Sequence, residues 1–228
     1  MNTVPERAAP LRDSRLGDIA RTLAGATAVL RRHKLDFCCG GDATLAEAAQ
    51  RRGADVARIE AELDALDPAA APVLPDEPAE LVAHIVTRFH DVHRAELPEL
   101  IALAAKVERV HREHAAAPAG LADALQRMRD ELLEHMHKEE QILFPMMAAN
   151  PGARLDPPIQ RMRAEHDDHG EALAELFALT DDLALPDDAC NSWRALYLGL
   201  RKFTEDLTEH IHTENNVLFP RFESAARG

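Results

Sequence analysis

The sequence predicts an all-α protein in which a small N-terminal helical domain is followed by an antiparallel four-helix bundle. The first observation behind this prediction is composition, because 46% of the 228 residues are hydrophobic but only 4% are aromatic. The apolar residues are mostly Ala, Leu, Val and Ile, and with 10 Gly in the chain this mixture favours helices over sheets. The second observation is a series of long segments with helical periodicity that are joined by short connections, as in an antiparallel bundle.

The N-terminal domain is predicted to span residues 1–66 and to contain short helices. Residues 16–33 show helical spacing of their apolar positions. Thr44 and Glu47 have the spacing of a capping box, in which two side chains satisfy exposed N–H groups at the start of a helix. Asp55 is suited to cap a further short helix.

A proline-rich segment separates this domain from the bundle. Residues 67–78 hold four prolines and are predicted to form a linker, since proline interrupts helices and stiffens an extended chain. The following part, residues 79–228, is predicted to form the bundle. Its four helical stretches are expected at 79–115, 119–149, 156–185 and 188–225. Because the connections between them are short, neighbouring helices should run antiparallel.

The bundle sequence contains an internal repeat that is rich in histidine. The motif H-M-H-K-E-E-Q-I-L-F-P begins at His135, and H-I-H-T-E-N-N-V-L-F-P begins 75 residues later at His210. Upstream, H-D-V-H begins at His90, and H-D-D-H begins 76 residues later at His166. Two helix pairs are therefore expected to be copies of each other, related by an approximate two-fold axis through the bundle.

The histidines lie on the apolar seam that each helix should turn toward the bundle core. In the second stretch the seam is expected at Leu121, Leu125, Met128, Leu132, His135, Glu139, Ile142 and Met146. In the fourth stretch it is expected at Trp193, Leu196, Leu200, Phe203, Leu207, His210, Glu214 and Val217. An ionised carboxylate in an apolar core costs several kcal/mol unless it is paired or bound to a metal. No Lys or Arg occupies the seam positions to pair with Glu139 or Glu214.

Six side chains on these seams are predicted to form a dinuclear metal site. Residues four apart share a helix face, so a histidine and a glutamate converge on two of the helices. These pairs are His135 with Glu139 and His210 with Glu214. Each of the other two helices adds one histidine from its H-D-x-H motif. Spacing leaves the choice open within each motif, between His90 and His93 and between His166 and His169.

The residue types limit which metal fits this site. Four histidines give two nitrogens per metal, and two bridging glutamates give each metal two oxygens. A solvent-derived oxo or hydroxo bridge would bring each metal to five ligands and leave one position open for a small molecule. Imidazole with carboxylate favours iron over calcium or magnesium, and the absence of seam thiolates argues against structural zinc. We therefore predict two non-haem iron ions, with manganese or zinc as alternatives and a metal-free polar network as the other interpretation.

Three further residues are candidates with two interpretations each. Glu165 precedes a histidine of the third helix and is either part of the metal site and its surroundings or a solvated surface residue. Cys38 and Cys39 lie in a glycine-rich loop, and adjacent cysteines rarely form a disulfide with each other. They are either a reactive or metal-handling thiol pair or small residues in a tight turn.

Charge and hydropathy exclude several classes of protein. Lys and Arg number 26 against 40 Asp and Glu, and the net charge of −14 argues against nucleic acid or an anionic membrane as a partner. No apolar run approaches the roughly 20 residues that a membrane-spanning helix needs. The first residues contain no apolar signal core, and three cysteines cannot build a disulfide framework, so we expect a cytoplasmic protein.

These motifs resemble those of the iron–sulfur cluster repair di-iron proteins, the "repair of iron centres" family, over almost the whole chain. The segment L-D-F-C-C-G-G-D-A-T-L is similar to the family's small cysteine-bearing domain, and the histidine motifs are similar to its hemerythrin-like bundle. The resemblance implies that the iron ligands are His90, His135, Glu139, His166, His210 and Glu214, and that the two glutamates bridge the ions. It also implies that Glu165 belongs to the site or its access route, and that Cys38 and Cys39 are the family's paired cysteines.

The resemblance further implies a stress-response function, the restoration of iron–sulfur clusters damaged by nitric oxide or oxidants. The centre would donate iron to a damaged cluster, bind and reduce nitric oxide, or both, so enzymatic turnover is left open. The alternative is a module that binds or senses O2 or NO without turnover. A two-metal hydrolase ranks last, because no basic residue on the seams would hold a phosphate. The expected partners are damaged iron–sulfur proteins and NO or O2, and the linker is compatible with exchange between the two chains of a homodimer.

Overall fold

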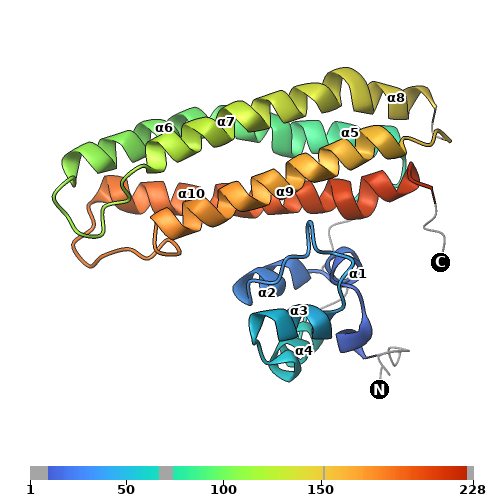
Figure 1. Cartoon of the computed structure of the whole chain (residues 1–228), viewed down its shortest axis with the longest axis horizontal. Helices are drawn as coiled ribbons and strands as arrows, with labels where there is room; N and C mark the ends of the chain where they lie inside the picture. Colours follow the sequence, from blue (N-terminus) through green and yellow to red (C-terminus); the bar gives the residue numbers. More distant parts are fainter. Residues whose placement is uncertain (1–9, 67–73, 151, 225–228) are drawn as a thin grey trace. The chain divides into compact units, whose positions relative to one another are not determined.

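The computed structural model describes residues 10–66, 74–150 and 152–224 (Figure 1). Every secondary-structure element in these ranges is an α-helix, a 3₁₀ helix or a π-helix, and the all-α prediction is confirmed. Within the same ranges, no helix combines the length and the apolar character needed to cross a membrane.

The described residues fall into two compact units. The first, the N-terminal unit, holds the chain up to Leu74 together with the segment His212–Val217, and the second, a helical bundle, begins at Pro75 and holds the rest. Of the predicted linker 67–78, residues 67–73 lie outside the described residues, so the limits of the linker stay a prediction. The helices of the N-terminal unit are η1 (Leu11–Asp13), α1 (Leu16–Thr22), α2 (Ala26–Arg32), α3 (Leu45–Arg52) and α4 (Val56–Asp64).

The single helical stretch expected at 16–33 is divided into two helices. Helix α1 ends at Thr22, and α2 begins at Ala26. Gly25 stands between them with a φ of 78°, a left-handed conformation that glycine adopts without the steric penalty of a side chain. The glycine therefore interrupts the helix although the apolar spacing continues through it.

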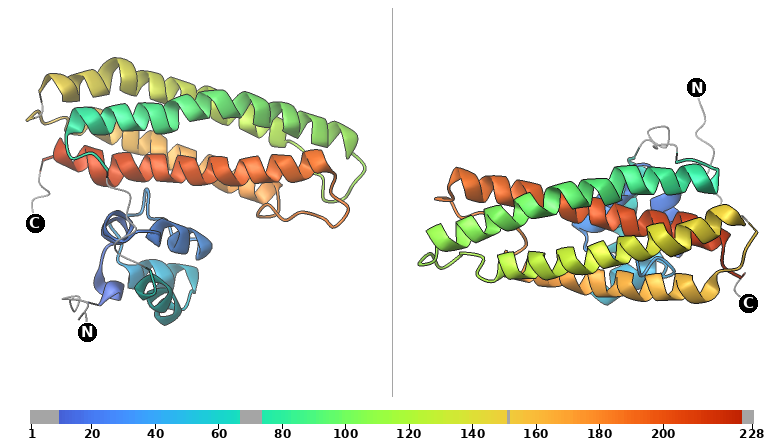
Figure 2. Two further views of the ribbon diagram at one scale, coloured as in Figure 1. Left: turned by 180° about the vertical axis from the view of Figure 1, so that it is seen from behind. Right: turned by 90° about the horizontal axis from the view of Figure 1, so that it is seen from above.

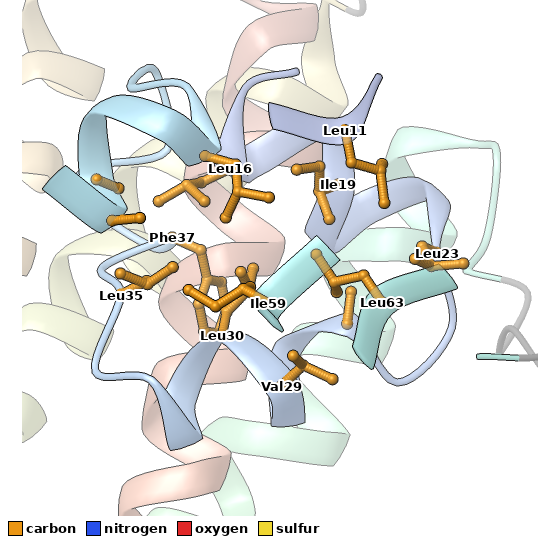
Figure 3. Packing of buried hydrophobic residues seen from close by; sticks show 14 residues of the cluster. Leu11, Leu16, Ile19, Leu23, Val29, Leu30, Leu35, Phe37, Ile59 and Leu63 are labelled. Atoms are coloured by element: carbon orange, nitrogen blue, oxygen red, sulfur yellow. The ribbon is translucent and has the colours of Figure 1, made fainter. Parts of the chain in front are cut away.

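The helix starts of α3 and α4 agree with the sequence. Thr44 Oγ1 accepts from Glu47 N at 3.2 Å and Glu47 Oε2 accepts from Thr44 N at 2.9 Å, which is the predicted capping box. Asp55 Oδ1 caps α4 by accepting from two backbone N–H groups. A cap of this kind contributes about 1 kcal/mol to stability. The apolar faces of these short helices meet in a core of their own (Figure 3), which includes Leu16, Leu30, Phe37, Leu45, Ile59 and Leu63.

The bundle consists of four helical rods whose direction alternates along the chain (Figures 1 and 2). The first rod is α5 (Pro78–Ile85), η3 (Val86–His90) and α6 (Asp91–Val110). The second is α7 (Leu121–Lys138), η4 (Glu139–Leu143) and α8 (Phe144–Ala149). The third is α9 (Asp156–Leu179), and the fourth is α10 (Asn191–His212), η5 (Thr213–Leu218) and η6 (Phe219–Arg221).

Three rods end earlier than expected. The fourth was expected to reach residue 225, but its last helix, η6, ends at Arg221. The first was expected to reach residue 115 but its last helix, α6, ends at Val110. The third was expected to reach residue 185, but α9 ends at Leu179 because a run of left-handed residues follows it. These residues, all with φ between 49° and 60°, are Asp181, Asp182 and Leu183.

Three of the four rods contain a π-helical turn next to a predicted metal ligand. These turns are η3, η4 and η5. A π turn holds one residue more than an α-helical turn, so it rotates the following residues by about 100° relative to a regular helix. In the fourth rod this rotation buries Leu218 in place of Val217, on which the prediction placed the seam.

The same rotation corrects the predicted seam of the second rod. Ile142 and Met146 were expected to face the core, yet they are 57% and 42% exposed. Their neighbours Leu143 and Met147 are buried instead. The error begins at Glu139, because a regular helical period carried past this residue leaves out the extra residue of the π turn.

Candidate metal centre

Six buried side chains form two clusters inside the bundle. The first cluster consists of His90, His210, Glu139 and Glu214, and the second of His135, His166, Glu139 and Glu214. Within each cluster, one donor atom of every side chain lies within 4.8 Å of the others. Because both glutamates belong to both clusters, the clusters share an edge made of two carboxylates. The structure thus brings together all six residues that the sequence analysis placed at the site.

Each cluster contains a pair of histidines whose Nε2 atoms face each other. The Nε2 atoms of His90 and His210 are 3.0 Å apart. Those of His135 and His166 are 3.1 Å apart. Glu139 lies between the two pairs, with its Oε2 3.5 Å from His90 Nε2 and 3.4 Å from His135 Nε2. One carboxylate oxygen therefore faces both histidine pairs.

Glu140 and Arg94 hold His90 from behind the cluster. His90 Nδ1 lies 2.7 Å from Glu140 Oε1, and since an ionised carboxylate only accepts, the ring nitrogen donates. Arg94 Nη2 donates to the same oxygen at 2.6 Å. Burial opposes ionisation of Glu140, but the hydrogen bonds from Arg94 and His90 outweigh it and lower the pKa of this carboxyl. A proton held on Nδ1 leaves the lone pair on Nε2 directed at the cluster, as in metal-binding histidines.

Glu165 holds His135 in the same way. Its Oε2 accepts from His135 Nδ1 at 3.0 Å. Its Oε1 accepts from Lys138 Nζ at 2.9 Å and from Arg161 Nε at 2.7 Å. The hydrogen bond from His135 is the main reason that the pKa of Glu165 lies well below its ordinary value, since burial acts in the opposite direction. This contact favours a supporting role for Glu165 over that of a solvated surface residue.

Phenylalanine rings stack on three of the four cluster histidines. The stacked pairs, with ring-centroid distances of 5.3, 5.8 and 5.9 Å, are Phe89 with His210, Phe144 with His90 and Phe219 with His166. An apolar wall of this kind lowers the local dielectric, so electrostatic interactions inside the centre are stronger than at the surface.

The second histidine of each H-D-x-H motif stays outside the clusters. His93 and His169 are buried, but neither contributes a donor atom to either group. His90 and His166, the first members, are the ones that stand with the other donors. The choice that spacing left open therefore falls on the first member of each motif.

Comparison with known proteins agrees with this geometry. Residues 81–222 match the family model of the hemerythrin HHE cation binding domain, and residues 12–67 match a domain of unknown function, DUF542. The iron-sulfur cluster repair protein YtfE of Dickeya chrysanthemi is 48% identical over 213 residues, which cover 92% of this chain and 96% of that protein. YtfE of Musicola paradisiaca is 50% identical over 218 residues with the same coverage. The chain belongs to the YtfE family.

Membership of the YtfE family confirms the resemblance drawn from the sequence motifs. YtfE of Yersinia pseudotuberculosis, at 47% identity over 213 residues, extends the same match to a third organism. The buried histidine and glutamate clusters lie inside the segment that matches the HHE domain. The prediction of a hemerythrin-like bundle is confirmed, and these clusters are groups of donors in it that could hold a metal ion.

In this YtfE-family bundle a groove of about 570 Å³ opens between α7 and α9. Its lining includes Met128, Lys138, Arg161, Glu165 and His169. Because Glu165 bonds a cluster histidine directly, the groove reaches the residue that stands behind the second cluster. Arg127, Lys138 and Arg161 add positive charge to a wall whose other charged residues are carboxylates.

Cys38 and Cys39 lie close to an aspartate in the N-terminal unit. Cys38 Sγ lies 3.8 Å from Cys39 Sγ and donates to Asp36 Oδ1 at 3.3 Å, while Cys39 N donates to the same oxygen at 3.0 Å. The hydrogen bond with Cys39, and then burial, raise the pKa of the Cys38 thiol well above its ordinary value. Cys38 is therefore protonated at neutral pH. The three side chains offer one oxygen and two sulfur donors within 4.8 Å of one another.

Sequence reasoning missed three charged residues at these sites. Glu140 lies off the predicted seam and inside the π turn η4, whose register a regular helical period does not give. Arg94 is recognised only through its contact with Glu140. Asp36 had a usable signal in the order D-F-C-C, because an aspartate often accepts from a backbone N–H two or three residues further on.

Proposed function

We propose that this chain is a di-iron protein that restores iron–sulfur clusters damaged by nitric oxide or oxidants. The observation that carries the proposal is the pair of buried clusters that share Glu139 and Glu214. The repair function is supported by relatives at 47 to 50% identity that are named iron-sulfur cluster repair proteins. Imidazole and carboxylate donors together are a set that suits iron.

Each iron would take two nitrogen ligands from one histidine pair. The pairs are His90 with His210 for one ion and His135 with His166 for the other. Glu139 and Glu214 would bridge the ions, since both contribute donor atoms to both clusters. These six side chains would leave room at the ions for a small ligand. Such a centre, when bound, would supply iron for transfer and a place where nitric oxide binds.

The chain's own residues orient the donors and keep water away from them. Glu140 and Glu165 keep a proton on the Nδ1 atoms of His90 and His135, so that both Nε2 atoms remain metal-binding. The stacked phenylalanine rings limit solvent around His90, His166 and His210. The donors are thus held in place before any metal arrives.

Cys38 and Cys39, with Asp36, would receive or relay iron. Their donor set of two thiols and one carboxylate supports this role. Because the Cys38 thiol is protonated at neutral pH, binding of a metal there releases a proton and becomes tighter as the pH rises. We place the protein in the cytosol, where reducing conditions keep such thiols free.

The first test of the di-iron centre is the metal content per chain, with an optical spectrum, for the wild type and for His210→Ala. Two irons per chain with an absorption band of an oxo-bridged ferric pair are expected for the wild type. The substitution should reduce the metal content and the band together. A chain without iron, or one zinc that the substitution leaves in place, would contradict the proposal.

The repair function is tested by the recovery of an iron–sulfur hydratase that has been inactivated with nitric oxide. The wild type should restore hydratase activity, and Glu139→Ala should not. Glu99→Ala is the matched control, because Glu99 is an exposed glutamate on α6 outside both clusters. Equal recovery with wild type and Glu139→Ala would exclude a mechanism based on the metal centre. A protein that only binds or senses NO would show ligand spectra without any recovery.

A further inference from the structure

Two buried histidines of the bundle have no role in the centre described so far. His93 is fully buried and His169 is 2% exposed. In the described part of the chain, neither ring nitrogen of either residue has a hydrogen-bond partner. Burying a polar group without a partner lowers stability, and native proteins rarely keep such groups without a reason. That the same feature occurs in both halves of the repeat makes chance packing a poor explanation.

The topology of the bundle places both histidines in one layer. Helices α6 and α9 run in the same direction, opposite to α7 and α10 (Figure 1). His93 and His169 follow the cluster histidines of α6 and α9 by three residues. Glu139 and Glu214 follow the cluster histidines of the opposite rods by four residues. Because the rods are antiparallel, the two free histidines lie on one side of the cluster histidines and the two glutamates lie on the other.

Ring contacts agree with this layer. The His93 ring lies 5.5 Å from the ring of His210 and 5.5 Å from that of Phe203, which precedes His210 by seven residues. The His169 ring lies 5.0 Å from the ring of His135. Each of these histidines is thus adjacent to a different cluster, on the side away from the glutamates.

The chemistry of the two imidazoles suits hydrogen bonding. Both imidazole rings are buried, and each keeps at least one N–H whatever its protonation state. A neutral imidazole offers one N–H donor and one acceptor nitrogen. His169 also lines the groove between α7 and α9, which gives a small solute a path toward this layer.

We propose that His93 and His169 donate hydrogen bonds to a small ligand, of the class of nitric oxide or azide, that occupies the open metal positions on the side opposite the two glutamates. This inference rests on the proposed di-iron centre. The ligand must be small and must carry a lone pair, because the layer is buried and the two donors are imidazole N–H groups. Both histidines are positioning residues for the ligand and are not metal ligands, since neither belongs to the donor clusters.

The test is azide binding to the oxidised, iron-loaded chain, measured by optical titration for the wild type, His93→Met and His169→Met. Loss of a hydrogen bond to an anion should raise the azide dissociation constant about tenfold in each Met variant while the iron content stays that of the wild type. His93→Gln and His169→Gln keep an amide N–H donor and should bind azide within about threefold of the wild type. The N–O stretching frequency of the nitric oxide adduct should shift in the Met variants and less in the Gln variants.

A second readout uses the metal-free chain. His93→Met and His169→Met remove an unpartnered polar group, so they should unfold at the wild-type temperature or above it. His111→Met is the matched control, because His111 Nε2 has a partner in Cys190 Sγ at 3.2 Å, and this variant should unfold earlier with unchanged azide binding.

Two outcomes would overturn the inference alone. One is unchanged azide affinity in iron-replete Met variants, and the other is loss of iron from the Met variants, which would make the histidines part of the metal-binding set. A wild-type chain that holds no iron would contradict the proposed function, and with it this inference.

Discussion

The two halves of the bundle repeat the same ligands but surround them differently. In one half Phe89 precedes the cluster histidine of its rod, and in the other half Glu165 does. Phe89 stacks on His210, whereas Glu165 accepts a hydrogen bond from His135. An apolar contact and an ionised one thus occupy equivalent places. The repeat fixes the metal-binding side chains, and the residues behind them have diverged.

A second difference lies one residue past the shared glutamates. Glu140 follows Glu139 and holds His90, and its counterpart in the repeat is Asn215. Each cluster therefore has one histidine that a carboxylate holds, but this carboxylate comes from η4 for His90 and from α9 for His135. The two metal positions should then be alike in ligand type and distinct in the groups that control them.

The largest expected effect comes from removing a side chain that the two clusters share. Glu139→Ala should lower the metal content from two ions per chain to below about one, because this side chain belongs to both clusters. His166→Ala affects one cluster only and should keep about one ion. Metal analysis of the purified variants measures this, and a one-ion Glu139→Ala chain would show that the glutamate serves a single position.

A smaller effect on metal affinity should distinguish the two clusters. Glu140→Gln and Glu165→Gln each remove the charge that holds one histidine, and each should weaken metal binding about 10- to 100-fold in the cluster of that histidine. Competition with a chelator should show one fast and one slow phase of iron release in each variant. Glu99→Gln, on the exposed face of α6, is the control. Equal acceleration of both phases would mean that the two clusters are not controlled separately.

Substitution of Phe89 should change the stability of the chain more than its metal binding. Phe89 is buried, and Phe89→Leu should cost about 1 kcal/mol of unfolding free energy in the metal-free chain. Urea denaturation gives this value, and chelator competition should show iron release close to that of the wild type. If Phe89→Leu weakened metal binding as much as Glu165→Gln, the ring would have to be counted as part of the metal site.

The smallest expected effect is a pH-dependent change of stability in the N-terminal unit, which serves as a reference for the effects in the bundle. Hydrogen bonds from Arg32, and then from His33, lower the pKa of Glu62 in the N-terminal unit to about 2. A carboxyl whose pKa is lowered on folding adds stability above its ordinary pKa near 4.5, and this stability is lost as the pH falls toward 2. The difference in melting temperature between wild type and Glu62→Gln should therefore vanish over that range, with or without metal. A difference that persisted at pH 2 would contradict the assignment.

The metal-ligand candidates that repeat could be predicted from the sequence. Side-chain burial and helix ends could not be predicted where the backbone departs from a regular α-helix. Glu139 and Glu214 could be found because a carboxylate on an apolar seam is costly, and this argument needs no coordinates. Ile142 was placed in the core wrongly, because the π turn η4 leaves no mark in the apolar periodicity. Glu140 was missed for the same reason, and the end of α9 was missed because non-glycine residues adopt left-handed conformations after it.

The π turns also divide the bundle into two packing registers. Apolar positions before Glu139 follow one helical phase, and those after Leu143 follow another that is displaced by a residue. An engineer who wishes to exchange one end of this bundle for that of another protein should place the junction within the extra turn, where the two phases already meet. A graft that moved the junction by a few residues would carry the wrong phase into one end and turn its apolar side chains outward.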